Sequence, residues 1–295
     1  MLSFVAHRRR WYLFSGVLVA ASIIAIAVWR FNFGIDFTGG SLLEFSFTGD
    51  RPGIADVQQR ITDAGATRVK VQTAGDHNII IRTAPIASDV HAKITDAYAD
   101  VATEQRFESI GPSIGRELAR KAATGLVLSL AAIMCYIAWV FRKASREVSS
   151  WAYGVVAFVA MLHDILIPMG VFAILGAFRH VEVDAPFIAA LLTILGYSIN
   201  DTIIVLDRVR ENVNVLRGKP FTDIVEASIR QSFARSVNTT LTTVLALLAV
   251  ILIGGPSIRY FAIALAIGIG VGAYSSIFIA APLLVTWYER KRRQN

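Results

Sequence analysis

Long apolar runs separated by short charged stretches dominate this chain. The runs lie at residues 11–29, 122–141, 151–177, 187–206, 239–253 and 261–287. Each is near the ~20 residues that an α-helix needs to cross ~30 Å of hydrocarbon. The pattern therefore predicts six transmembrane helices. The fifth run has a polar beginning, and we expect its helix to start nearer Phe233.

The first run is too long for the apolar core of a signal peptide, which covers only about 7–15 residues. It continues past Ala20 and Ala21 to Trp29, and Trp11 stands at its other end. Tryptophan is enriched where a helix leaves the hydrocarbon. We therefore expect an uncleaved first span within residues 1–30.

The one long polar region, residues 31–120, alternates strand-type and helix-type patterns. We expect strands at 41–47, 68–73, 77–82 and 105–110 and helices at 54–64 and 88–102. Val69, Val71, Ile79 and Ile81 show the two-residue period of a half-buried sheet. The order βαββαβ is the ferredoxin-like arrangement. The sequence predicts an α-helical polytopic membrane protein with a small α+β ferredoxin-like domain between spans one and two, and spans two to six within 121–295.

The basic residues gather at one set of span ends. Lys and Arg cluster at 8–10, 142–146, 208–235 and 290–293, whereas the short loops 178–186 and 254–260 carry one Arg each. The positive-inside rule then puts both termini in the cytoplasm and residues 31–120 outside. The net charge of +7 in 295 residues, with 55% hydrophobic residues and a mean hydropathy of +0.55, reflects this topology and not nucleic-acid binding.

The stretch between the fourth and fifth spans, residues 207–236, is charged but patterned. Gly218 and Pro220 interrupt it, and an apolar stripe then includes Ile224, Ile229 and Phe233. Such a stripe is typical of an amphipathic helix. We expect a short interfacial helix that leads into the fifth span, with a solvated connector as the alternative.

The fourth span contains a carboxylate, Asp201, inside its apolar run. Such a residue costs roughly 3 kcal/mol on insertion scales and indicates a functional site by default. Asp201 precedes Asp207, the expected inner boundary, by about 9 Å at 1.5 Å per residue. Arg235 and Thr239 lie in the first turns of the fifth span and share a helix face, because they are four residues apart. Thr242 and Thr243 extend that face one turn deeper, to a depth that matches Asp201. If these spans pack together, Asp201 meets Arg235 and a row of hydroxyl groups.

This pairing suits an ion relay. Burial favours the neutral carboxyl group and a guanidinium favours the charged one, so a balanced site changes protonation when helices shift. A structural ion pair without a transport role is the alternative. His163 and Asp164 in the third span are candidates for a second relay element or for packing, and we place Asn200 and Asn238 in the same group.

Motifs for other chemistry are missing from the sequence. No Ser/His/Asp nucleophile set, Walker A loop or metal-ligand spacing occurs, and the single Cys135 lies in an apolar run. We therefore expect neither an enzyme with a hydrolase or ATP site nor a bound metal or cofactor. The small-residue stripe Ala264, Gly268, Gly272 and Ser276 predicts close helix packing.

Several motifs together resemble the SecD/SecF family of protein-export membrane proteins, within the resistance-nodulation-division superfamily. They are residues 34–40 (GIDFTGG), 196–202 (GYSINDT), 207–212 (DRVREN), 235–240 (RSVNTT) and the pair 163–164 (HD). The resemblance runs from residue 9 to about residue 290. A single six-span unit with a small outer domain fits the SecF branch and not the SecD branch, whose outer domain is much larger. The motif residues after the first span are Gly34, Asp36, Phe37, Gly39 and Gly40.

The resemblance implies that the chain pairs with SecD in a pseudo-symmetric twelve-span unit beside the SecYEG translocon, with YajC as a further candidate partner. That unit would use a proton or sodium gradient to help draw preproteins across the membrane. Asp201 would carry the ion, with Arg235 and Thr239 as its partners. Two alternatives stay open: half of a gradient-driven exporter of small molecules or lipids, and a non-transporting membrane scaffold.

Overall fold

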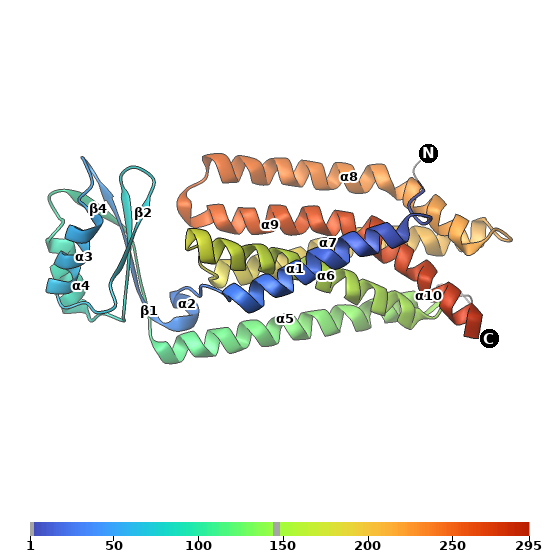
Figure 1. The fold of residues 1–295 in the computed structure, drawn as a ribbon, viewed down its shortest axis with the longest axis horizontal. Helices are drawn as coiled ribbons and strands as arrows, with labels where there is room; N and C mark the ends of the chain where they lie inside the picture. The colour runs from blue at the N-terminus through green and yellow to red at the C-terminus, as the bar shows by residue number, and fades with distance from the viewer. Residues whose placement is uncertain (1–2, 144–147, 295) are drawn as a thin grey trace. The chain divides into compact units, whose positions relative to one another are not determined.

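The computed structural model describes residues 3–143 and 148–294. The chain forms two compact units. One comprises Met1–Asn32 with Thr124–Asn295 and holds the helical bundle; the other is Phe33–Ala123. Figure 1 shows both ends of the chain at the same end of the bundle.

The bundle confirms six candidate spans in the described part of the chain. The helices are α1 (Arg8–Trp29), α5 (Pro112–Val140), α6 (Ser150–Arg179), α7 (Ala185–Val215), α8 (Phe221–Ile253) and α9 (Pro256–Ser275), which continues through the π-helical segment η2 (Ser276–Ala280) into α10 (Ala281–Gln294). A short 3-10 turn, η1 (Phe141–Lys143), follows α5. Helix α1 packs on α6, while α7, α8 and α9 pack on one another and α6 lies against both α7 and α9.

The stretch before the fifth span differs from the expectation. Helix α8 is continuous from Phe221 to Ile253, so the expected interfacial helix and the span are one element. No Gly or Pro occurs within it, and nothing therefore interrupts its ladder of i→i−4 hydrogen bonds. Helix α7 likewise runs beyond the apolar segment to Val215.

The smaller unit is a four-stranded antiparallel sheet with two longer helices and one short helical turn. Its elements are α2 (Ile35–Thr38), β1 (Gly40–Phe47), α3 (Ile54–Asp63), β2 (Lys70–Ala74), β3 (Asn78–Thr83), α4 (Ser88–Asp96) and β4 (Ala102–Ile110), and the strand order is β2-β3-β1-β4. Phe45 pairs with Ile79 across β1 and β3, and both are buried with Ile61 and Ile94 in the core. The sequence predicted the helix from residue 88 to extend to 102, but it ends at Asp96, because Ala102 already pairs with Phe47 in the sheet.

The motif residues 34–40 form the entry to this sheet. Gly34 precedes the single turn α2, which contains Asp36 and the buried Phe37. Gly39 and Gly40 then have φ of 74° and 146°. A Cβ atom on Gly40 would lie 2.7 Å from the Thr83 carbonyl oxygen. Both the backbone conformation and this close approach require glycine.

Candidate functional site

One turn of α7 carries three buried polar side chains. Ser198, Asp201 and Thr202 are each no more than 3% exposed. Their spacing of three and four residues places them on adjoining parts of one helix face. Because the surrounding helix is apolar, these groups must find partners on other helices. Each of them does so on a different neighbour.

A hydrogen bond from a serine joins Asp201 to α8. The Ser236 hydroxyl donates a hydrogen bond to the Asp201 carboxylate, and Ser236 is itself 1% exposed. Arg235, the preceding residue, is exposed and forms no ion pair with Asp201 in the described chain. The structure thus puts Ser236 at the carboxylate and leaves the guanidinium on the adjoining helix face.

Four other polar residues at the start of the fifth span lie on an exposed face of α8. This polar face of α8 consists of Arg235, Asn238, Thr239 and Thr242. Among the described residues, the two hydroxyls bond only to backbone carbonyls of their own helix. Thr239 Oγ1 lies 2.8 Å from the Arg235 oxygen, and Thr242 Oγ1 lies 3.0 Å from the Asn238 oxygen. Asn200 of α7 is also exposed. In the described part of the chain, none of these side chains forms a hydrogen bond or an ion pair with Asp201.

Tyr197 fastens α7 to α8 beside this face. Its hydroxyl donates to the Thr239 carbonyl oxygen at 3.1 Å and lies 3.1 Å from Thr243 Oγ1. The Tyr197 and Ser236 contacts together fix the register of the two helices around Asp201. The α7–α8 pairing that the sequence predicts is therefore present, with side-chain contacts that sequence reasoning missed.

His163 and Asp164 form a second buried group, on α6. Asp164 is fully buried and accepts hydrogen bonds from Ser198 Oγ of α7 and from Ser275 Oγ of α9, the latter at 2.7 Å. The His163 Nδ1 atom lies 2.9 Å from Asp164 Oδ1. Its Nε2 atom is buried and has no hydrogen-bond partner in the described chain. The carboxylate thus joins three helices at one point.

A third contact links α7 to the π-helical segment. The Thr202 and Ser276 hydroxyls lie 2.9 Å apart, and Ser276 is the first residue of η2. Single π-helical turns occur frequently at functional sites. Close approach of α9 makes these contacts possible, since a Cβ on Gly272 would lie 2.9 Å from Ser198 Cβ.

Four serines of this polar centre were not predicted as site residues: Ser198, Ser236, Ser275 and Ser276. For Ser236 a signal existed, because Ser228, Ser232 and Ser236 recur every four residues and all three are buried. For Ser276 the same small-residue stripe that indicates packing also supplies the hydroxyl. No group of three or more His, Cys, Asp or Glu that could hold a metal occurs in the described residues.

In the part of the chain that the structure describes, six candidate spans and their buried carboxylates define a polytopic membrane protein with a polar intramembrane centre. The chain matches the family "Protein export membrane protein SecD/SecF, C-terminal" over residues 90–290 and the "SecD/SecF GG Motif" over residues 24–50. It therefore belongs to the SecD/SecF family of protein-export membrane proteins, and the resemblance seen in its motifs is confirmed.

Curated relatives place the similarity on the SecF side of that family. Protein translocase subunit SecF of Anaerolinea thermophila is 39% identical over 97% of this chain and 94% of its own length. SecF of Thermobaculum terrenum is 38% identical over the same shares of both chains. Because these matches are near full length, they support a function as an accessory subunit of the Sec translocase.

A solved relative shares the fold. The crystal structure of SecDF, a translocon-associated membrane protein from Thermus thermophilus, superposes with a TM-score of 0.85 at 33% identity. It covers 98% of this chain, but this chain spans only 39% of that one. A second SecDF structure, in a super-membrane-facing form, gives a TM-score of 0.71.

Proposed function

We propose that this chain is a SecF-like subunit that, with SecD, couples a proton or sodium gradient to a late step of protein translocation. The observation that carries the proposal is Asp201, a carboxylate 3% exposed within a membrane-spanning helix. Burial at such a position is costly and is typical of ion pathways. The chain would act as a transport subunit, without hydrolysis of its own.

The membrane potential supplies a usable force at this site. One elementary charge that crosses 100 mV gains about 2.3 kcal/mol. That energy changes an equilibrium constant roughly fifty-fold, because 1.4 kcal/mol corresponds to a factor of ten. Binding or release of one cation at Asp201 can therefore bias a helix bundle between two arrangements. The bond from Ser236 depends on that event, since a neutral carboxyl group accepts less strongly than a carboxylate.

The polar face of α8 supports assembly with SecD. Arg235, Asn238 and Thr239 are exposed on a helix that spans the membrane. Polar side chains in lipid almost always face other protein or water. A second six-span half would cover this face and bring its own groups toward Arg235. The SecDF relative, of which this chain spans 38%, joins both halves in one polypeptide. SecYEG and YajC remain partners implied by the family.

The smaller unit fits a ferredoxin-like domain on the outer side of the membrane. Its β1-α3-β2-β3-α4-β4 order and the sheet order β2-β3-β1-β4 support this assignment. Both chain ends carry clusters of arginine, which favours the cytoplasm of a bacterial inner membrane for the termini. The domain would then meet the preprotein as it emerges.

The test compares Asp201→Asn with Asp207→Asn, one carboxylate inside the span and one near its end. Asp207 pairs with Arg210 at 2.8 Å, and both side chains are close to half exposed. Gradient-dependent release of a translocating preprotein is measured from membranes that contain each variant. Arg235→Ala is included as the third variant.

The proposal expects Asp201→Asn to lose gradient-dependent release while SecD still copurifies in normal amount. Asp207→Asn should keep both properties, because its exposed pair contributes little. Collapsing the proton and sodium gradients separately identifies the ion. Unchanged release with Asp201→Asn would refute coupling at this site and would favour a scaffold, which tolerates loss of the carboxylate.

A further inference from the structure

A groove of about 660 Å³ lies between α6 and α10 at the basic end of the bundle. Its walls are apolar side chains of both helices: Val156 and Val159 from α6, and Leu283 and Trp287 from α10. The volume is within the range of small-molecule sites, which hold about 300–1,000 Å³. A groove of this size can enclose part of a small ligand, which the outer face of a single helix cannot do.

Two cations stand at one end of this groove. Arg290 and Lys291 line it together with Trp287 and Gln294. These positions recur at three and four residues and so share one face of α10. Both basic side chains are exposed, and neither forms an ion pair with another described residue. Glu289, by contrast, is paired with Arg8 at 2.6 Å and does not neutralise them.

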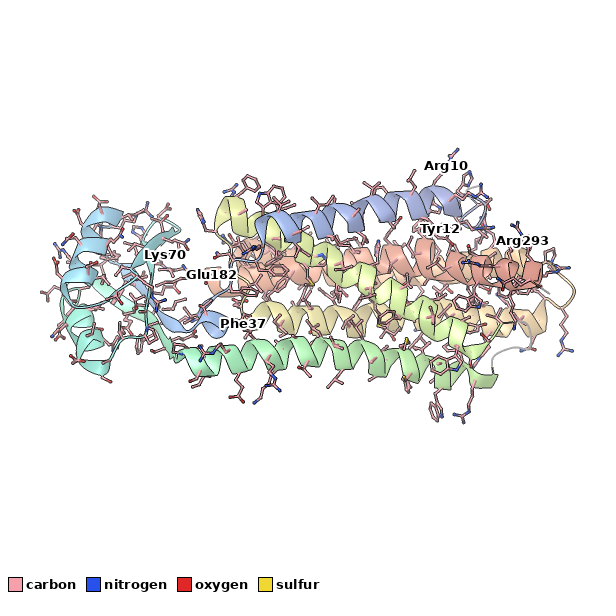
Figure 2. The ribbon with its side chains drawn as sticks, turned by 60° about the horizontal axis from the view of Figure 1, so that its bottom comes forward. Arg10, Tyr12, Phe37, Lys70, Glu182 and Arg293 are labelled. Atoms are coloured by element: carbon pink, nitrogen blue, oxygen red, sulfur yellow. The ribbon has the colours of Figure 1, made fainter. Side chains whose placement is uncertain are left out.

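The change from apolar to basic occurs where α10 approaches the chain end. Figure 2 shows Arg10 and Arg293 toward the same end of the bundle. Tryptophan is typical of the level at which a helix leaves the hydrocarbon, and Trp287 is 40% exposed. The groove thus has an apolar part at the depth of acyl chains and a cationic part at the depth of headgroups.

We propose that this groove binds an anionic phospholipid. One acyl chain lies against Val156, Leu283 and Trp287, and the headgroup phosphate meets Arg290 and Lys291. A guanidinium binds phosphate oxygens in a two-pronged geometry and an ammonium adds a point charge. Basic pockets between spans hold such headgroups on the cytoplasmic side of membranes, which is the side that the proposed topology gives to this end of the bundle. An apolar helix of a partner would fill the walls but leave both cations without a counter-charge.

The chain provides a matched control on the opposite side of the same helix. Arg292 and Arg293 line a separate recess of about 640 Å³ with Lys219 and Tyr288, and they also have no ion pair among the described residues. Removing either basic pair changes the net charge by the same amount. The variants R290Q/K291Q and R292Q/R293Q therefore separate a local site from general basicity.

A third variant tests the apolar wall without a change of charge. Val159 is 41% exposed in the groove, so Val159→Trp places a bulky ring there with little effect on the buried core. If the groove holds an acyl chain, the introduced ring should compete with that chain for space. A headgroup bound only by surface charge would not be affected.

The measurement is native mass spectrometry of the full chain released from detergent micelles, titrated with phosphatidylglycerol or phosphatidylcholine. The wild type and R292Q/R293Q should retain one phosphatidylglycerol. R290Q/K291Q should bind about 30-fold more weakly, because each cation near the headgroup is worth about 1 kcal/mol. Val159→Trp should also reduce retention, whereas soluble glycerol phosphate should not displace the lipid.

Four outcomes would overturn the proposal. Equal weakening in both double variants would indicate diffuse charge, and equal retention of phosphatidylcholine would indicate unspecific apolar binding. Displacement by glycerol phosphate would assign the cations to a soluble anion. Normal lipid binding by Val159→Trp together with loss of SecD copurification would make the groove a protein interface. None of these four outcomes depends on whether the chain has the export activity proposed above.

Discussion

Replacement of Asp164 tests how the polar centre holds the bundle together. In Asp164→Leu, Ser198 loses the only hydrogen-bond acceptor, and His163 Nδ1 the only side-chain partner, that each has among the described residues. A buried group left unsatisfied costs about 1–3 kcal/mol in soluble proteins. Between membrane helices the measured coupling averages about 0.6 kcal/mol and reaches about 1.7. Two such losses predict a destabilisation of about 1–4 kcal/mol.

The serines on α7 and α9 respond differently to this change. Ser275 Oγ lies 3.0 Å from the Gly272 carbonyl oxygen as well as 2.7 Å from Asp164, so its hydroxyl has a second acceptor. Ser198 has none among the described residues. Double-mutant cycles with Ser198→Ala and Ser275→Ala should therefore give a coupling of about 1 kcal/mol for Asp164 with Ser198 and less than about 0.5 for Asp164 with Ser275.

The assay is equilibrium unfolding of the full chain in mixed micelles, followed by circular dichroism. Asp164→Asn serves as the control, because its amide oxygen still accepts one of the hydroxyl hydrogen bonds and the volume is unchanged. It should lose less stability than Asp164→Leu. Equal stability of Asp164→Leu and the wild type, or equal coupling to the two serines, would refute this account of the centre.

Two further predictions concern other parts of the chain. Gly268→Val should destabilise the bundle by about 1–3 kcal/mol, because a Cβ there would lie 2.2 Å from Ile194 Cδ1. Gly270→Ala should not destabilise it, because a Cβ at that position meets nothing within 4 Å. The same unfolding assay measures both variants. Burial raises the pKa of Tyr98 above its usual 10.0, and its hydroxyl has no partner in the described chain. Below pH 10 the neutral Tyr98 side chain makes its full contribution to the free energy of unfolding. This contribution is lost as the pH rises through the folded-state pKa, because the tyrosine ionises more readily in the unfolded state. Thermal unfolding between pH 9 and 11 should show this loss in the wild type and less of it in Tyr98→Phe.

Hydropathy and periodicity were sufficient for the spans and the strands. Six apolar runs correspond to six helices, and alternation at Val69–Val71 and Ile79–Ile81 marks the paired strands β2 and β3. Helix ends were harder to predict, as α7 and α8 show. Their polar turns continue the helix beyond the hydrocarbon, and hydropathy does not report where a polar helix ends.

The partner of Asp201 could not be read from spacing alone. Arg235 and Thr239 share a face, as expected, but adjacent residues on a helix are separated by about 100°. The choice between Arg235 and Ser236 therefore depends on how α8 is rotated against α7. The structure shows the small side chains Ser228, Ser232 and Ser236 turned inward, which allows the helices to approach and leaves Arg235 outward.

This rotation gives the two sides of α8 separate roles. The inward side meets Asp201 through Ser236, and the outward side presents Arg235 and Thr239. Only 6% of the apolar stretch of α8 is buried within this chain, compared with 61% for α6. Hydrogen bonds also hold the polar turn of α7 in place. Asp164 of α6 joins it to α6 and α9, and Thr202 joins it to η2. Under the proposed coupling, a change of charge at Asp201 would act on the Ser236 contact between α7 and α8, and α8 is the less buried of these two helices.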